Sequence, residues 1–355
     1  MPLIDRLGIS VPVIQAPMAG VSTPTLAAAV SNAGALGSIG VGATDAHHAR
    51  LMIDELRART DRAFNVNLFV HGPAKADPVR EAAWLDRLAP LFAEFGAEPP
   101  TTLQTIYKSF AEDADMLAML LATAPPVVSF HFGLPPASTI RALQERNILL
   151  LATATSVEEA HLIEDAGIDA IVAQGIEAGG HRGIFDPSAS DDALGMATLT
   201  RLLVKESRLP VIAAGGIMDG AGIAAAVDLG AVAAQLGTAF IACSESAADE
   251  AYRAALMGTG AYHTTLTPII SGRPARVLAN RFSSLAATLS NCEPPDYPIA
   301  YDAGKALHAA AKAKGESGFG AQWAGQGAPL ARAMPAAKLV ETLRRELQHC
   351  RHDSV

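Results

Sequence analysis

Short apolar runs recur along the first 240 residues and alternate with segments rich in Ala, Leu, Glu and Arg. The runs are continuously apolar, as in strands that are buried on both faces. Alternation with helix-like segments is typical of parallel strands joined by right-handed helical crossovers. The pattern predicts eight strands, at residues 11–17, 36–42, 64–70, 127–133, 147–154, 170–175, 210–216 and 231–238.

Eight such units predict an α/β fold of the (β/α)₈ TIM-barrel type. A doubly wound open sheet has the same alternation but usually carries a G-x-G-x-x-G turn after its first strand. Here the first strand leads into APMAG (16–20), which lacks that spacing, so the barrel is favoured. The gap at 71–126 is longer than one crossover requires and predicts an additional helical segment.

The pattern changes after residue 240 to helix-like segments with polar breaks. We therefore expect a barrel over 1–242, an appended, mainly helical, substrate-covering region over 243–320, and a C-terminal segment over 321–355 that returns to the barrel. Apolar residues at i, i+3 and i+4 spacing predict a surface helix over 335–349.

Composition narrows the possible partners and the compartment. The net charge of −9 and the lack of a Lys or Arg block argue against nucleic acid. Cys243, Cys292 and Cys350 are far apart in sequence, which suggests neither a disulfide framework nor a zinc site. Without a signal-like or membrane-length apolar stretch, we expect a cytoplasmic protein with no membrane partner. The oligomeric state is left open between monomer and homodimer.

Amide side chains recur at the carboxyl ends of the predicted strands, where barrels place their chemistry. They are Asn67, Gln174 and Gln235. An amide both donates and accepts hydrogen bonds, which suits the edge of a heterocycle. A single one is most simply a structural residue, but three of them accompanied by glycines favour a ligand site.

Glycine-rich turns follow the last two predicted strands, at Gly215-Gly216 and at Gly237-Thr238. Barrels often bind a phosphate at this place through free backbone N–H groups. One phosphate together with amide-rich edges predicts the mononucleotide FMN. The small, uncharged turn at Met18 and Ala19 suits the face of the flavin ring.

The stretch AGGHRG (178–183) follows the sixth predicted strand. It is either a plain turn or a place where the backbone passes close to a flat or anionic ligand. His181 in this stretch and His131 after the fourth strand are candidates for a general base or for a donor to an anion. No metal site is predicted, because the histidine spacing and the lack of a carboxylate cluster do not suit one. Six further histidines in polar, helix-like contexts are expected to be solvated: His47, His48, His161, His308, His349 and His352.

Tyr297, Tyr301 and Lys305 are four residues apart in YPIAYDAGK and share one face of a predicted helix. The stripe either packs on the barrel or forms a receptor for a small dianion.

Taken together, QAPMAG, NVNLF, VSFHFG, AQGIEAGGHRG, AAGGI and AQLGTAF resemble the class I branch of the FMN-dependent nitronate monooxygenases, formerly called 2-nitropropane dioxygenases. The likeness extends from about residue 11 to beyond residue 326, where WAGQG resembles a late flavin-contacting turn of the family. It implies oxidation of alkyl nitronates, such as propionate 3-nitronate, by O₂ to carbonyl compounds with release of nitrite or nitrate, a detoxification. It also favours a substrate role for the Tyr-Tyr-Lys stripe.

The resemblance and the strand-end pattern predict His181 and His131 as catalytic residues, and Tyr297, Tyr301, Lys305 and His131 as substrate-binding residues. The predicted FMN-binding residues are Ala16, Met18, Ala19, Asn67, Gln174, Gly179, Gly180, Gly215, Gly216, Gln235, Leu236, Gly237, Thr238 and Gln326. An alternative is an NAD(P)H-dependent FMN quinone or enoyl reductase with the same barrel, since such relatives also carry a GGH turn. A third hypothesis is a flavin-binding protein without turnover.

Overall fold

The computed structural model describes residues 1–289 and 292–352, without the side chain of residue 352. Its main element is a sheet of eight parallel strands in the order β1-β9-β8-β6-β5-β4-β3-β2. A backbone bridge between Ile14 and Leu36 joins β1 to the segment entering β2 and closes the barrel. The predicted α/β barrel is confirmed, and its strands are β1 (Val13–Gln15), β2 (Gly37–Gly40), β3 (Phe64–Phe69), β4 (Val127–His131), β5 (Leu149–Ala154), β6 (Ala170–Gln174), β8 (Val211–Ala214) and β9 (Ala233–Leu236).

Helices surround the barrel, and several of them begin at side-chain caps. Thr23, Asp45 and Ser156 each accept a hydrogen bond from a backbone N–H in the first turn of the helix that follows. The outer helices are α2 (Pro24–Asn32), α3 (Ala46–Arg57), α5 (Ala114–Thr123), α6 (Ala137–Glu145), α7 (Val157–Asp165), α8 (Met196–Glu206) and α9 (Gly220–Asp228). The shorter α1 (Leu3–Leu7) and α10 (Thr238–Ile241) complete this part of the chain.

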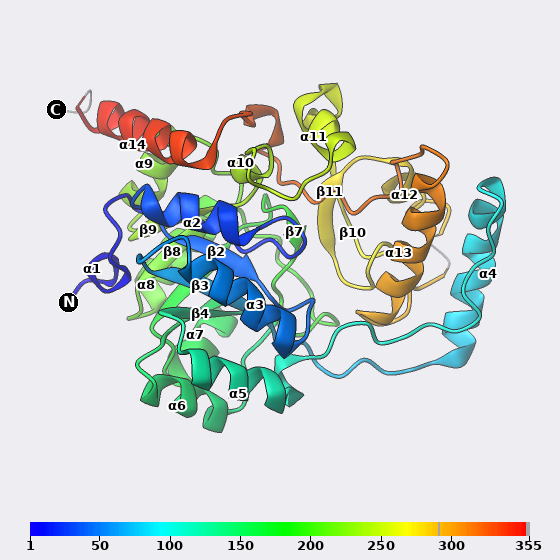
Figure 1. The fold of residues 1–355 in the computed structure, drawn as a ribbon, viewed down its shortest axis with the longest axis horizontal. Helices are drawn as coiled ribbons and strands as arrows, with labels where there is room; N and C mark the ends of the chain where they lie inside the picture. Colours follow the sequence, from blue (N-terminus) through cyan, green and yellow to red (C-terminus); the bar gives the residue numbers. More distant parts are fainter. Residues whose placement is uncertain (290–291, 353–355) are drawn as a thin grey trace.

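The predicted C-terminal helix is present as α14 (Ala336–His352), which returns to the barrel and packs on α2 and α9 (Figure 1). Its apolar side Leu339, Val340 and Leu343 is fully buried in a cluster with residues of those two helices. Burial of this one face explains the apolar spacing that is visible in the sequence.

A lobe stands beside the carboxyl ends of the barrel strands (Figure 1). It contains α11 (Glu250–Met257), α12 (Arg281–Ser284), α13 (Ile299–Lys312) and α4 (Pro78–Glu94). The predicted extra helical segment before β4 is therefore present, and its helix α4 packs on α13 around Trp84, Phe92 and Leu307. The predicted domain boundaries at residues 242 and 320 stay a prediction. Helix α4 packs in the lobe although its residues precede the predicted range 243–320.

The lobe also contains strands that the sequence pattern did not indicate. β10 (Thr264–Thr267) and β11 (Ala275–Leu278) pair antiparallel, and β11 also pairs with β7 (Gly180–His181) from the AGGHRG stretch. These strands are too short to show a clear period in the sequence. Their pairing connects the lobe directly to the loop after β6.

None of the helices in the described residues is long and apolar enough to cross a membrane.

Candidate active site

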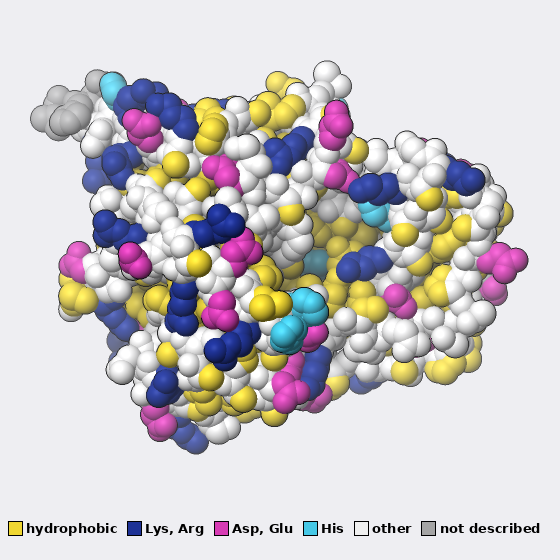
Figure 2. Space-filling model, viewed as in Figure 1, with side chains coloured by type: hydrophobic (Ala, Val, Ile, Leu, Met, Phe, Trp, Pro, Cys, Tyr) yellow, Lys and Arg dark blue, Asp and Glu magenta, His cyan; other side chains and the backbone are white. Residues whose placement is uncertain are grey.

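A cavity of about 640 Å³ lies at the carboxyl ends of the barrel strands, between the barrel and the lobe. Figure 2 shows it as a hollow with basic and histidine side chains near its edge. Its size falls within the range of small-molecule sites. Predicted residues from the ends of six barrel strands, from α13 and from the turn before it meet in its wall: Ala16, Met18, Ala19, Asn67, His131, Gln174, Gly179, Gly180, His181, Gly215, Gly216, Gln235, Gly237, Thr238, Tyr297, Tyr301 and Lys305.

Two of the predicted residues are not part of this wall. Leu236 is buried. Gln326 is exposed, and its backbone N–H donates to the carbonyl oxygen of Glu177 at 2.9 Å. Its neighbour Gly327 does line the cavity.

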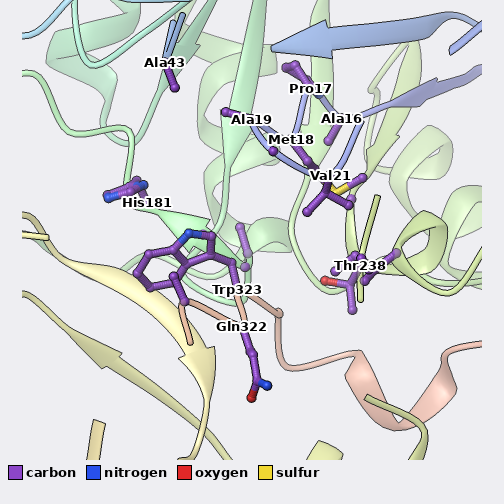
Figure 3. Close-up of a pocket in the computed structure, with 18 of the residues that line it drawn as sticks. Ala16, Pro17, Met18, Ala19, Val21, Ala43, His181, Thr238, Gln322 and Trp323 are labelled. Atoms are coloured by element: carbon purple, nitrogen blue, oxygen red, sulfur yellow. The ribbon is translucent and has the colours of Figure 1, made fainter. Parts of the chain in front are cut away.

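The turn after β1 is held by a buried network. Gln15 accepts a hydrogen bond from the backbone N–H of Ser38 at 2.8 Å and donates to the Ser22 hydroxyl at 2.9 Å. The same hydroxyl accepts from the backbone N–H of Met18 at 2.9 Å. In Figure 3 the turn from Ala16 to Val21 lies across the cavity from His181 and Trp323. The turn thus presents a small, uncharged and well-supported surface.

The strand-end amides differ in which of their hydrogen-bonding atoms have no protein partner among the described residues. Asn67 uses its NH₂ group on the Ser129 hydroxyl at 2.9 Å and on the Ser129 carbonyl oxygen at 3.2 Å. Both ends of the Gln174 amide are taken by the loop that follows β6: its NH₂ group donates to the His181 carbonyl oxygen at 3.0 Å, and its oxygen accepts from the Gly183 N–H at 2.7 Å. Gln174 therefore lines the cavity and also fixes the position of the AGGHRG stretch.

Backbone donors without acceptors in the described part of the chain lie in the glycine-rich turns that line the cavity. The N–H groups of Gly216, Gly237 and Thr238 donate to no group in the described residues. The chain approaches itself closely here, since a Cβ on Gly179 would lie 2.4 Å from the backbone nitrogen of Gly325. Gly216 has φ of +71°, which a side chain rarely adopts. The turns form a cradle of backbone donors that suits an anion such as a phosphate.

The two candidate histidines have different free atoms. His131 Nε2 lies 3.1 Å from the His181 carbonyl oxygen and must donate to it, so its Nδ1, 3.1 Å from Thr153 Oγ1, accepts from that hydroxyl. His181 Nε2 lies 2.8 Å from Ser271 Oγ, and that hydroxyl donates to the Arg273 carbonyl oxygen at 3.2 Å. The Nδ1 of His181 has no partner among the described residues, so His181 has a nitrogen available to a ligand.

Burial lowers the pKa of both imidazoles. The pKa of His131 falls to about 4 and that of His181 to about 3, mainly because a charged ring would lose its hydration. Neighbouring positive charge on Arg273 acts in the same direction on both rings. Both histidines are therefore neutral near pH 7.

The Tyr-Tyr-Lys stripe faces the cavity, but only Tyr301 and Lys305 lie on α13. Tyr297 lies in the turn before this helix, so the expectation that it shares the helix face was wrong. The rings of Tyr297 and Tyr301 are centred 5.3 and 6.2 Å from the His181 ring. The Tyr297 hydroxyl is buried and has no hydrogen-bond partner among the described residues. Lys305 Nζ lies 5.5 Å from the Tyr301 ring centre and 5.0 Å from that of Tyr107. The stripe thus offers two phenols and an ammonium group beside His181.

Several site residues were missed in the sequence. Ser271, Trp323 and Tyr107 approach His181 or the stripe from separate loops, and no local pattern connects them. The expectation that His308 is solvated was wrong: it lines the cavity, and its buried Nδ1 lacks a partner among the described residues. Its place three residues after Lys305 on the same helix face could have revealed this.

The other histidine expectations had different outcomes. His47, His48, His161 and His349 are exposed, as expected. The side chain of His352 lies outside the described part of the chain.

Comparisons with known proteins agree on one family. A family model described as nitronate monooxygenase matches residues 1–346. The chain is 63% identical over 346 residues to a nitronate monooxygenase of Paraburkholderia phytofirmans, covering 98% of this chain and 94% of that protein. A nitroalkane oxidase structure from Streptomyces ansochromogenes is similar with 40% identity and a TM-score of 0.92 over 99% of both chains. A structure of FabK from Thermotoga maritima is less similar, with 30% identity and a TM-score of 0.76, covering 99% of this chain and 97% of that one.

The low pKa values predict a pH-dependent stability. An unfolded chain protonates histidine near its ordinary pKa of 6.5, whereas folded His131 and His181 stay neutral until far lower pH. Stability contributed by each neutral ring is present above about pH 6.5 and is lost as the pH falls below it, by about 2 kcal/mol per ring at pH 5.

Urea unfolding at pH 7 and pH 5 should show a smaller loss of stability for His131→Asn and His181→Asn than for the wild type. His47→Asn, at an exposed position, is the control and should keep the full loss. If His131→Asn and His181→Asn both kept the wild-type pH dependence of stability, the lowered pKa values of these two rings would be contradicted.

Proposed function

This chain belongs to the nitronate monooxygenase family and is therefore an oxidoreductase, and we propose that it uses FMN and O₂ to oxidise alkyl nitronates such as propionate 3-nitronate. The products are a carbonyl compound and nitrite or nitrate. The observation that carries this proposal is the cavity itself, in which His181 with a free Nδ1 and the Tyr-Tyr-Lys stripe lie opposite a cradle of backbone donors.

The described residues fit a flavin mononucleotide. The unpaired N–H groups of Gly216, Gly237 and Thr238 suit one phosphate, and the Met18 to Ala19 turn suits the flat ring. The amides of Asn67 and Gln235 lie in the wall where they can meet the polar edge of the ring. When bound, the flavin supplies the electron acceptor that the oxidation requires and the donor to O₂.

His181 has two roles that depend on the form of the substrate. With a neutral nitroalkane, the bare Nδ1 takes the proton from the carbon beside the nitro group while Nε2–H donates to Ser271. With a nitronate that proton is already gone, and rotation of the Ser271 hydroxyl to donate to Nε2 lets Nδ1–H donate to the anion. Ser271 thus acts as a positioning residue that sets the tautomer.

His131 affects the site indirectly, through the main chain of His181. Because both of its nitrogens are bonded to protein groups, it holds the carbonyl of His181 in place. It borders the substrate without a free nitrogen of its own.

The stripe binds the tail of the substrate. Lys305 and the phenols of Tyr301 and Tyr297 can receive a carboxylate while the nitronate end lies at His181. Propionate 3-nitronate carries charges at both ends and matches this arrangement.

The reaction is tested by anaerobic mixing of the flavin-loaded protein with propionate 3-nitronate and, separately, with NADH. We expect the nitronate to remove the oxidised-flavin absorbance far faster than NADH does, because the nitronate is already an electron-rich anion. Rapid reduction by NADH coupled to quinone turnover, with no response to the nitronate, would instead support the reductase alternative.

The phosphate cradle is tested at Gly237, where φ of −103° and contacts of 3.4 Å or longer leave room for a side chain. Gly237→Asp should abolish flavin binding because its carboxylate repels the phosphate, whereas the isosteric Gly237→Asn should retain much of it. The measurement is the flavin released per chain on denaturation, which should be FMN at one per chain in the wild type. Equal flavin content in both variants, or release of FAD, would contradict the proposal.

The tail-binding role predicts a substrate-dependent effect of Lys305→Met. Its KM for propionate 3-nitronate should rise roughly tenfold, while that for ethyl nitronate should change little, since only the former has a second anion. Lys312→Met is the matched control, because Lys312 lies farther along the same helix and is paired with Asp249 at 2.6 Å. Equal losses for both substrates would show that the stripe is structural.

The base role predicts an asymmetric loss in His181→Asn. We expect kcat/KM to fall roughly 10²-fold or more with nitroethane, as is typical when a general base is lost, and noticeably less with ethyl nitronate. His131→Asn should slow both substrates alike, since its ring nitrogens are occupied. If His181→Asn also slowed both alike, the base would have to be another residue.

A further inference from the structure

We infer that Arg273 makes the cavity selective for the anionic form of its substrate, because its buried and unpaired guanidinium favours a nitronate over the corresponding neutral nitroalkane. The inference rests on the proposed function and extends it to a residue outside the cavity wall. Arg273 is in the loop between β10 and β11, two residues after Ser271.

The guanidinium of Arg273 is buried without an ion pair among the described residues. Only 3% of the residue is exposed. One terminal NH₂ group donates to the carbonyl oxygen of Ile184, and Nε has no hydrogen-bond partner in the described part of the chain. Its central carbon lies 4.3 Å from the centre of the Phe132 ring. A buried cation in this state is costly unless a negative charge compensates it.

Two neighbouring buried arginines show how such a charge is usually compensated. Arg182 forms a two-pronged ion pair with Asp191, at 2.8 and 2.9 Å. Arg276 donates twice to the Ile176 carbonyl oxygen and once to the Thr264 hydroxyl, and the charge of Glu177 opposes it. Arg273 has neither a full set of acceptors nor a carboxylate in contact.

The groups that face Arg273 offset its charge only in part, through carboxylates that act on it without contact. Glu159 and Asp186 act on it only from beyond contact, and their oxygens already accept hydrogen bonds from Thr155, Phe185 and Ser188. Burial raises the pKa of the Tyr297 phenol, which stays neutral. His71, His131 and His181 also have lowered pKa values and are neutral near pH 7.

The ring of Phe132 contacts the guanidinium of Arg273 and also both histidine rings. Its ring centre lies 4.6 Å from that of His131 and 5.6 Å from that of His181, and the guanidinium carbon lies 4.3 Å from the same ring centre. Phe132 keeps φ of +77°, a conformation that costs free energy for a bulky residue and is typical of functional sites. Replacement of water by an aromatic ring leaves the field of Arg273 poorly screened at His181.

The wall of the cavity contains no other compensating anion near His181. Its only carboxylate among the described residues is Asp249, which is paired with Lys312. An anion bound at His181 therefore adds negative charge that offsets the charge of Arg273 further, whereas a neutral ligand does not.

The test uses ethyl nitronate and nitroethane, which differ by one proton. Flavin-loaded Arg273→Gln and Arg273→Met are compared with Arg273→Lys, which keeps the charge, and with Arg276→Gln, which removes a different buried charge. The measurements are kcat/KM for ethyl nitronate, the dissociation constant of nitroethane from the change in flavin absorbance, and the NMR titration of the His131 and His181 rings.

Neutral variants at 273 should lose about tenfold or more in kcat/KM for ethyl nitronate while binding nitroethane about as well as the wild type. The titrations of His131 and His181 should move to higher pH, because a nearby positive charge has been removed. Arg273→Lys and Arg276→Gln should show neither the selective loss nor the shifted titration. The Met variant retains most of the side-chain volume if the Gln variant does not fold.

Equal losses for nitronate and nitroethane, with unmoved histidine titrations, would overturn the inference and leave Arg273 a structural residue. The same selective loss in Arg273→Lys would also overturn it, since the charge is then not the cause. If the wild type did not oxidise nitronates at all, the proposed function would fail, whereas the histidine titrations would still report whether Arg273 sets the field.

Discussion

The site depends on the way in which the side chain of Gln174 holds the loop after β6. Its amide donates to the carbonyl oxygen of His181 and accepts from the N–H of Gly183, so both ends of one strand-end side chain fix one short stretch of backbone. His131 adds a second donor to the same carbonyl oxygen. With its backbone fixed, the stretch can pair as β7 with β11, and this pairing joins the lobe to the barrel. The position of His181 and that of the lobe thus follow from the same few hydrogen bonds.

Desolvation determines the chemistry that this arrangement can perform. His181 lies among the rings of Phe132, Tyr297 and Trp323, and His131 also contacts Phe132, so a charged imidazole is unfavourable at both positions. The rings therefore stay neutral, which suits a base or a donor whose proton position is set by Ser271. The same low polarity makes an unpaired guanidinium effective at a distance. Neutral histidines and a buried cation together favour an anionic ligand.

The barrel and the lobe contribute different kinds of groups. The barrel offers backbone N–H groups and small side chains at its strand ends, and these are the groups that we propose to bind the phosphate and the flat ring of the flavin. The lobe offers the long side chains of α13, of which Tyr301 lies beside His181 and Lys305 beside Tyr301. Substitutions on α13 can therefore change substrate preference without altering the cofactor cradle.

Much of the architecture was predictable from the sequence because it depends on local periodicity. Continuous apolar runs identify strands that are buried on both faces, and a parallel barrel brings their carboxyl ends together. The same reasoning predicts that Asn67, His131, His181 and the glycine turns belong to one site. Tertiary structure alone decided which of their atoms are free. Nothing local indicates that the amide of Gln174 is occupied by the loop. Ser271, Trp323 and Arg273 reach the histidines through contacts between segments distant in sequence, and such contacts leave no period in the chain.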